Sequence, residues 1–166
     1  MSRSSGAAAR PSTSVLIEDD GWRKAGSNLA SAVKRAAKLA LARGKVSGRL
    51  QAGLTVLLTS DARIRALNKQ HRGKDKATNV LSFQPAAGIS YLGDIAVAYG
   101  TALREAEAAG TPLLDHSVHL VIHGVLHLLG YDHEESRAAE IMESLEAEIL
   151  AQMGISNPYK RRTRAA

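Results

Sequence analysis

The sequence predicts an α+β fold: a single domain with one mixed sheet of about four strands and about five helices. The chain has 166 residues, which is enough for one compact domain and short for two. Some segments repeat apolar residues with the period of a helix, whereas others are short, β-rich apolar runs. Because these segments follow one another in mixed order, we expect helices packed against one sheet rather than a strict strand-helix alternation.

The first part of the chain contains two strand candidates and two helix candidates. Residues 14–18 predict a short strand, and residues 54–59 (LTVLLT) are so apolar that we expect a strand covered on both faces. Ser60 can then cap a helix that carries Ile64 and Leu67 on one face. Between the two strands, residues 27–42 predict a helix that Gly44 stops, with apolar residues at helical spacing: Leu29, Val33, Ala36, Ala37 and Ala40.

The second part begins with residues 72–79 (RGKDKATN), which have no apolar periodicity and predict an exposed loop. Strands are expected at residues 80–83 and 92–98, and a helix at 101–109. Pro112 suits the first turn of the next helix, residues 112–129, and Gly130 is expected to end it in a left-handed conformation. The last helix, residues 136–153, closes at Gly154 and shows apolar residues at intervals of four: Ile141, Leu145, Ile149 and Met153.

The domain is expected to span residues 14–159. Residues 1–13 are rich in Ser, Ala and Arg and lack acids, which favours a disordered tail over a transit peptide. Residues 160–166 form a basic C-terminal tail. No apolar run approaches the length of a membrane span, and the N-terminus lacks the apolar core of a secretory signal. We therefore expect a cytoplasmic protein with no membrane partner.

Composition restricts the kinds of site and partner. The chain has no Cys, which excludes disulfides, iron-sulfur clusters and Cys-type zinc modules, so a transition-metal site must use the six His and the carboxylates. Residues 1–78 contain 16 Lys and Arg against 5 Asp and Glu, whereas residues 79–159 contain 2 against 11. A basic front half would suit a polyanion such as nucleic acid, although solvated surface charge explains the same counts.

The most informative segment is residues 119–133, HLVIHGVLHLLGYDH. His123 and His127 are four apart, which places both imidazoles on one helix face, and the turn at Gly130 lets His133 supply a third nitrogen. Three imidazoles leave the fourth position of a tetrahedral ion open, as in catalytic zinc sites. A single histidine would be better explained as a surface or core residue. The three together predict one Zn²⁺ per chain.

The same spacing occurs in the metzincin proteases, whose motif has Glu directly after the first His as general base. In this chain that position is Gly124. Without the carboxylate a peptidase lacks its proton acceptor, so a metallopeptidase is disfavoured. A phosphodiester, whose anionic oxygens bind readily to a metal and to Arg, suits the site better.

Other polar residues have open roles. His119 lies one turn before His123 and could support a ligand, face substrate or pack, and His116 is expected to be structural. For Asp132, capping the turn or orienting an imidazole is favoured over acting as general base. Arg72, Lys74 and Lys76 lie in one charged stretch, where a guanidinium could meet the charge that develops on a phosphoryl group. A solvated basic loop is the alternative.

Two motifs, HRGKDKATNVLSF at residues 71–83 and HGVLHLLGYDH at 123–133, closely resemble the YbeY endoribonucleases, the bacterial rRNA maturation factors. The resemblance extends over about residues 54–159. By position, the family's zinc ligands fall on His123, His127 and His133, and its functionally important Arg falls on Arg72. We therefore expect Arg72 and the ligand His127 to be catalytic.

This resemblance implies a single-strand-specific, metal-dependent endoribonuclease with an α+β fold and a zincin-like histidine helix. Its expected role is maturation of the small-subunit rRNA 3′ end and ribosome quality control, with metal-activated water attacking a phosphodiester. Its partners would be single-stranded RNA, rRNA and the ribosome or its proteins. Two residues depart from the family pattern: His71, where Tyr is usual, and Gln84, which separates Phe83 from Pro85. A competing hypothesis is a ribosome-associated assembly factor whose metal is mainly structural.

Overall fold

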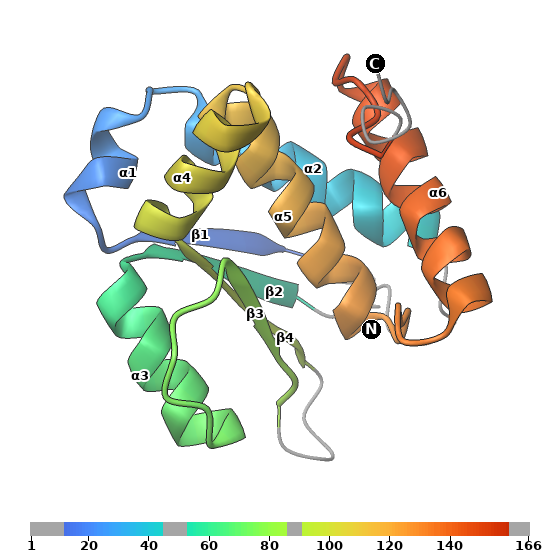
Figure 1. The fold of residues 1–166 in the computed structure, drawn as a ribbon. Coiled ribbons are helices and arrows are strands. Elements are labelled where there is room, and N and C mark those ends of the chain that lie inside the picture. The colour runs from blue at the N-terminus through green and yellow to red at the C-terminus, as the bar shows by residue number, and fades with distance from the viewer. Residues whose placement is uncertain (1–11, 45–52, 86–90, 160–166) are drawn as a thin grey trace, which may run out of the picture.

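The computed structural model describes residues 12–44, 53–85 and 91–159. Its sheet has four strands in the order β1-β2-β4-β3. Three of them are parallel, and β3 pairs antiparallel with β4 at one edge. The predicted α+β fold with one mixed four-stranded sheet is confirmed (Figure 1). The strands are β1 (Thr13–Ile17), β2 (Gly53–Thr59), β3 (Val80–Phe83) and β4 (Tyr91–Ala98).

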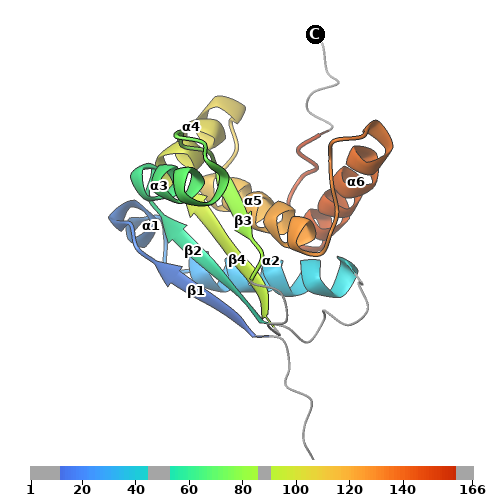
Figure 2. The same ribbon diagram turned by 90° about the horizontal axis from the view of Figure 1, so that it is seen from below.

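Helices cover the two faces of the sheet unequally. The first face packs against α2 and α5, which also pack against each other, and α6 lies outside them. On the second face α3 covers one end, and Figure 2 shows the strands extending beyond it. The described residues contain six helices: α1 (Asp20–Lys24), α2 (Leu29–Gly44), α3 (Asp61–Arg72), α4 (Tyr99–Ala109), α5 (Leu113–Leu128) and α6 (Ser136–Gln152).

The partial cover of the second face corrects the expectation for β2. Leu54, Val56 and Leu58 are buried against the first helical layer, but Thr55 and Leu57 on the other face are only half-buried. Leu57 packs partly against the small cluster beneath α3, while Thr55 lines a groove. The β2 strand is therefore covered fully on one face only, which leaves part of the sheet accessible.

Helix α1 was not predicted from the sequence, because its five residues are too few to show a period. Its N-cap is Asp19, whose carboxylate accepts from the backbone N–H of Gly21 at 2.7 Å. Trp22 is fully buried, and its indole N–H donates to the carbonyl of Thr59 at 2.9 Å. One buried Trp thus anchors helix α1 to the end of β2 through this hydrogen bond.

The remaining elements lie within two residues of their predicted limits. Thr13, assigned to the N-terminal tail by the sequence, is the first residue of β1 and pairs with Leu54. The rest of the predicted tails, residues 1–11 and 160–166, lies outside the described residues. In the described part of the chain, no helix has the length and apolar character needed to cross a membrane.

Candidate metal centre

Helix α5 carries four histidines along one face. His116, His119, His123 and His127 follow one another at spacings of three, four and four residues, which brings them onto the same side of a helix. Apolar side chains on the other sides fix α5 between the sheet and α2, and the following are fully buried: Val118, Val121, Ile122, Val125 and Leu126. The row of imidazoles is therefore built on a rigid support.

The end of α5 redirects the chain toward this row. Gly130 has φ of 103°, a left-handed value that favours glycine, as predicted. Its N–H donates to the carbonyl of His127 at 3.0 Å, and the N–H of Tyr131 donates to Leu126 at 3.0 Å. These two bonds form a Schellman motif, which ends the helix and turns the chain back.

Asp132 then fixes the approach of His133. One carboxylate oxygen accepts from the backbone N–H groups of His133 and Glu134, at 2.6 and 3.2 Å. The structure thus gives Asp132 a turn-capping role, one of the two roles favoured from the sequence. His133 itself is exposed, so the histidine group opens toward solvent on this side.

Three histidine nitrogens converge at this point. One nitrogen each from His123, His127 and His133 lies within 4.8 Å of the others, a group that could hold a metal ion. Nε2 of His127 and Nδ1 of His133 are 3.1 Å apart. Two nitrogens bound to one tetrahedral zinc at about 2.0 Å would be about 3.3 Å apart. The donor types, and the distance between the nitrogens of His127 and His133, therefore fit one zinc-sized cation with three protein ligands.

The surroundings keep the central imidazole in the form that binds metals. Burial lowers the pKa of His127, and the neighbouring His123 and His133 lower it further. A neutral imidazole has a free lone pair on one nitrogen, which is what a metal requires. The three rings also lie close together, with centroids 4.5 to 5.4 Å apart.

Behind the metal-facing side of His123 lies a buried carboxylate that sequence reasoning missed. Oε1 of Glu146 on α6 is 2.7 Å from Nδ1 of His123. Burial by itself raises the pKa of Glu146, but hydrogen bonds from His119, His123 and Tyr159 outweigh it and lower the pKa to about 2. Glu146 is therefore ionised, although only 1% of it is exposed.

The missed carboxylate lies beside the apolar stripe expected on α6. Of the residues the sequence indicated, Ile149 is buried and Leu145 and Met153 pack partly against the core, whereas Ile141 is 50% exposed. The residues that α6 buries are Met142, Glu146, Ile149 and Leu150. A lone acid within an otherwise apolar stripe was the available signal, because such an acid needs partners when it is buried.

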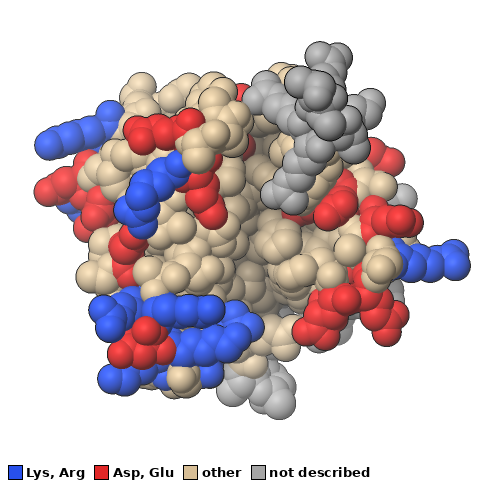
Figure 3. All heavy atoms as spheres, viewed as in Figure 1, with Lys and Arg blue, Asp and Glu red and all other residues tan. Residues whose placement is uncertain are grey.

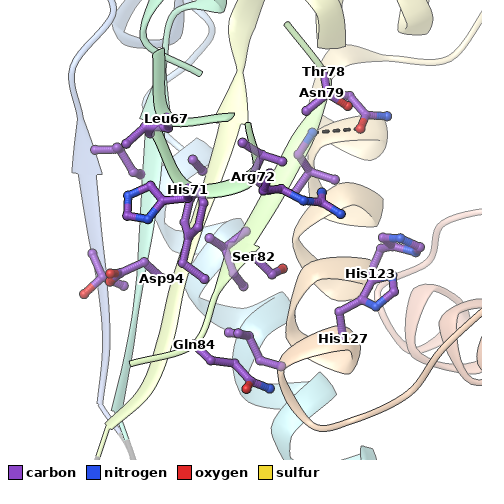
Figure 4. A pocket seen from close by; sticks show the side chains of 18 of the residues that line it. Leu67, His71, Arg72, Thr78, Asn79, Ser82, Gln84, Asp94, His123 and His127 are labelled. Atoms are coloured by element: carbon purple, nitrogen blue, oxygen red, sulfur yellow. Dashed lines mark hydrogen bonds between the residues drawn. The ribbon is translucent and has the colours of Figure 1, made fainter. Parts of the chain in front are cut away.

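Arg72 shares a groove with the histidines. The groove has a volume of about 1260 Å³ and is lined by Arg72 and Ser82 as well as His123, His127 and His133. Figure 4 shows the Arg72 side chain extending from the end of α3 toward α5. No described residue forms a hydrogen bond or an ion pair with its guanidinium. The structure thus brings the predicted arginine and the predicted ligands to one cavity.

The other residues of the charged stretch do not reach this cavity. Lys74 and Lys76 are exposed and are not among the groove-lining residues, so the three cations offered by the sequence are separated. His71, next to Arg72, points to the opposite side of β3 (Figure 4). Its ring packs against Phe83, with centroids 4.8 Å apart and planes tilted by 47°. His71 and Phe83 together line the part of the groove over the sheet.

The two upstream histidines contact carboxylates and tyrosine. Nε2 of His116 lies 3.0 Å from Glu105 of α4, which also accepts from the Asn79 amide at 3.0 Å. This agrees with the structural role expected for His116. Nε2 of His119 lies 3.1 Å from the hydroxyl of Tyr159. His119 is therefore linked to Glu146 through Tyr159, and its Nε2 also lies 3.5 Å from Oε1 of Glu146 directly.

Gly124 is a point where α5 packs closely against the sheet. Its carbonyl accepts from the Ser82 hydroxyl at 3.0 Å. A Cβ at this position would lie 2.9 Å from Cγ2 of Ile95 and 3.2 Å from that hydroxyl. A glutamate here would clash with the side chains of Ile95 and Ser82, which gives a packing reason for the absence of the metzincin carboxylate.

Comparison with known proteins identifies relatives over most of the chain. The profile of the family described as Endoribonuclease YbeY matches residues 17–154, extending the resemblance seen in the sequence toward the N-terminus. A protein named Endoribonuclease YbeY from Rhodopseudomonas palustris (strain ATCC BAA-98 / CGA009) is 46% identical over 95% of this chain and 86% of its own. One of the same name from Paracoccus denitrificans is 44% identical over 87% of this chain and 88% of its own.

The fold comparison agrees with these matches. The solution structure of TM1509 from Thermotoga maritima is similar with a TM-score of 0.57 and 26% sequence identity. The similar region covers 86% of this chain and 91% of that one. The profile spans well over half of the chain, and the named relatives exceed 40% identity across nearly all of it. The chain belongs to the YbeY endoribonuclease family.

Proposed function

We propose that this protein is a metal-dependent endoribonuclease that cuts single-stranded RNA. The observation that carries the proposal is the convergence of His123, His127 and His133 in one groove with Arg72. Family membership supports the class of reaction, since the relatives are named endoribonucleases. Zn²⁺, one ion per chain, is the proposed cofactor because three imidazole nitrogen donors suit it.

The residues of the chain have separate tasks in this reaction. His123, His127 and His133 would hold the ion in neutral form. When bound, zinc supplies a Lewis acid that lowers the pKa of water to about 7 and polarises a bound oxygen. The Arg72 guanidinium would donate paired hydrogen bonds to phosphoryl oxygens and stabilise the charge that develops on them. Arg72 and the ligand His127 are thus the proposed catalytic residues.

The shape of the groove supports a single strand as substrate. At about 1260 Å³ it exceeds the usual volume of a small-molecule pocket, about 300 to 1000 Å³, and it is open at the His133 side. A single strand can bend to bring one phosphate between the histidines and Arg72. An A-form duplex holds its phosphates on a stiff cylinder and hides its base edges in a narrow major groove.

The biological setting follows from the family. We propose a role in maturation of the small-subunit rRNA 3′ end and in ribosome quality control, with rRNA and ribosomal proteins as partners. A ribosomal substrate also implies a cytoplasmic protein. We propose one catalytic domain over residues 14–159, extended at its start by Thr13 of β1.

The test is cleavage of one RNA sequence, alone and annealed to its complement, by highly purified protein. The comparison is His127→Ala prepared identically, with His116→Ala as the matched control on the same helix, since His116 pairs with Glu105 away from the cluster. Wild type and His116→Ala should cut the single strand much faster than the duplex, while His127→Ala should lose both cleavage and metal. Equal cleavage by all three proteins would point to a contaminating nuclease. RNA binding without cleavage would favour the assembly factor.

A further inference from the structure

We infer that Glu146, held in place by Tyr159, is the positioning residue that fixes the His123 ring for its metal. This inference rests on the proposed metal role of the three histidines. It concerns residues outside the two motifs that identify the family, namely the inner face of α6 and the turn that follows this helix.

Glu146 lies in a buried position, where a carboxylate destabilises the fold unless its oxygens have hydrogen-bond partners. It is 1% exposed and has apolar neighbours on the buried face of α6. A buried charge persists only when hydrogen bonds and opposite charges replace its water. Oε1 lies 2.7 Å from Nδ1 of His123, and Oε2 accepts from the Tyr159 hydroxyl at 2.5 Å. Both oxygens are thus satisfied, one by a proposed metal ligand.

This contact determines the tautomer of His123. Since Oε2 of Glu146 already accepts from Tyr159, Oε1 is the acceptor that faces Nδ1 of His123, and a hydrogen bond at 2.7 Å places the ring proton on that Nδ1. The other ring nitrogen, Nε2, is then left with a free lone pair, which is the form that binds a metal. The bond also restricts rotation of the ring about its side-chain torsions. Metal-binding histidines commonly donate their second N–H to a carboxylate in this way.

Tyr159 orients the carboxylate in turn. Its hydroxyl proton is used on Glu146, so the phenol oxygen is available as acceptor for Nε2 of His119 at 3.1 Å. The rings of His119 and Tyr159 are perpendicular, with centroids 5.6 Å apart. Tyr159 is itself set by a turn in which its N–H donates to Asn157 at 2.9 Å. A segment beyond α6 therefore reaches back to the ligand helix through one hydroxyl.

A purely structural network would behave differently from a positioning device. If Glu146 only joined α5 to α6, replacing it by a neutral residue of the same shape would alter stability and leave the metal affinity of the folded protein unchanged. If it positions His123, the same replacement lowers the affinity of the folded protein. The ligand field around the metal should change as well.

The experiment measures metal affinity rather than turnover. Glu146→Gln and Tyr159→Phe are compared with wild type by competition with a zinc chelator and by the visible spectrum of the Co²⁺ form. Glu148→Gln is the matched control on the same helix, because Glu148 is exposed and pairs with Arg43. Tyr99→Phe is the matched control for Tyr159, since Tyr99 packs against Trp22 in another part of the molecule. Circular dichroism establishes that each variant is folded.

We expect zinc affinity to fall about 10- to 100-fold in Glu146→Gln, less in Tyr159→Phe, and not at all in the two controls. The Co²⁺ spectrum should shift in the first two variants only. Wild-type affinity and spectrum in folded Glu146→Gln would overturn the inference. If that variant does not fold, Tyr159→Phe, which removes only a hydroxyl, decides by the same criterion. His123→Ala distinguishes a failure of this inference from a failure of the proposed metal site on which it rests. Zinc binding at wild-type affinity in that variant would overturn the metal site itself.

Discussion

Arg72 combines a defined position with an unpaired charge. It is the last residue of α3, and Gly73 follows in the left-handed conformation with φ of 69°. The N–H of Gly73 donates to Lys69 at 3.1 Å and so closes the helix. The backbone that carries Arg72 is thus fixed, while its guanidinium makes no hydrogen bond or ion pair with any residue the structure describes. Such a side chain can act on a ligand at little cost to the fold.

Replacing Arg72 should therefore separate chemistry from metal binding and stability. In Arg72→Ala we expect kcat to fall about 100- to 1000-fold, with zinc content and unfolding midpoint unchanged, because a charge-stabilising donor is removed. Arg72→Lys should recover only part of the rate, since an ammonium lacks the planar fork. Lys74→Ala is the control, because Lys74 belongs to the same charged stretch and does not line the groove. Equal turnover in Arg72→Ala and wild type would remove Arg72 from the mechanism.

Individual residues also show which parts of the site were predictable. His123, His127 and His133 were found because their spacing projects them onto one face and across one turn, and the structure brings their nitrogens together. Glu146 was missed because hydrophobic periodicity treats an acid as a marker of the exposed face. Only its partners, which are distant in sequence, explain why it is buried.

Among the elements, α5 is constrained from both sides. Its histidine face serves the groove, and its opposite faces are packed in the core. Where it crosses the sheet, a Cβ at Gly124 would meet the side chains of Ile95 of β4 and Ser82 of β3. The glycine therefore allows the histidine helix to pack closely against these two strands.

Gly124→Ala should destabilise the protein, although replacing a glycine by alanine within a helix usually raises the free energy of unfolding. In an open helix, alanine stabilises by about 1 kcal/mol relative to glycine. Here we expect a loss of about 1 to 3 kcal/mol in the free energy of unfolding, because the added methyl overpacks the contact with Ile95. Urea denaturation of Gly124→Ala, Ile95→Ala and the double variant measures the coupling. The loss of unfolding free energy caused by Gly124→Ala should be smaller when Ile95 is also replaced by alanine. A stabilised Gly124→Ala single variant would contradict this packing argument.

Element types were predictable where a period or a cap was long enough to detect. Ser60 caps α3 by accepting from the N–H of Arg63 at 3.1 Å, as its position before an apolar-periodic run suggested. Helix α1 has a cap and one buried Trp, and no periodicity follows from five residues. The β2 strand looked covered on both faces because apolar residues also occur where a sheet is only partly covered. The sequence of one strand does not reveal which other elements pack on each of its faces.

At the scale of the molecule, charge is divided across the groove. Figure 3 shows Lys and Arg side chains gathered over α3 and the loop after it, and Asp and Glu side chains over α6, with a hollow between them. The exposed cations of the first region are Arg63, Arg65, Lys69, Arg72, Lys74 and Lys76, which we term the α3 basic surface. The asymmetry counted along the sequence thus becomes an asymmetry in space.

This arrangement suggests how an RNA strand would be held. The other cations of the α3 basic surface lie on the same helix as Arg72 or in the loop after it, so phosphates flanking the cleaved one could contact them. Each such contact releases counterions from the nucleic acid, which makes binding weaken with salt. The acidic residues exposed near and on α6 would repel the same backbone. The strand should therefore run along α3 rather than along α6.

Reversing charge on the α3 basic surface should weaken RNA binding without affecting the metal centre. Lys69→Glu combined with Lys74→Glu removes two exposed cations that form no ion pair with any described residue. Lys34→Glu combined with Lys38→Glu, on the exposed side of α2, changes the net charge by the same amount and is the matched control.

For the Lys69→Glu and Lys74→Glu double variant we expect weaker binding of single-stranded RNA. The slope of log Kd against log salt should also be smaller by about 0.7 for each RNA phosphate that the variant no longer neutralises. Zinc content should stay the same in both double variants. If both double variants bind RNA equally weakly, net charge and not the α3 basic surface governs binding, and the path along α3 is wrong.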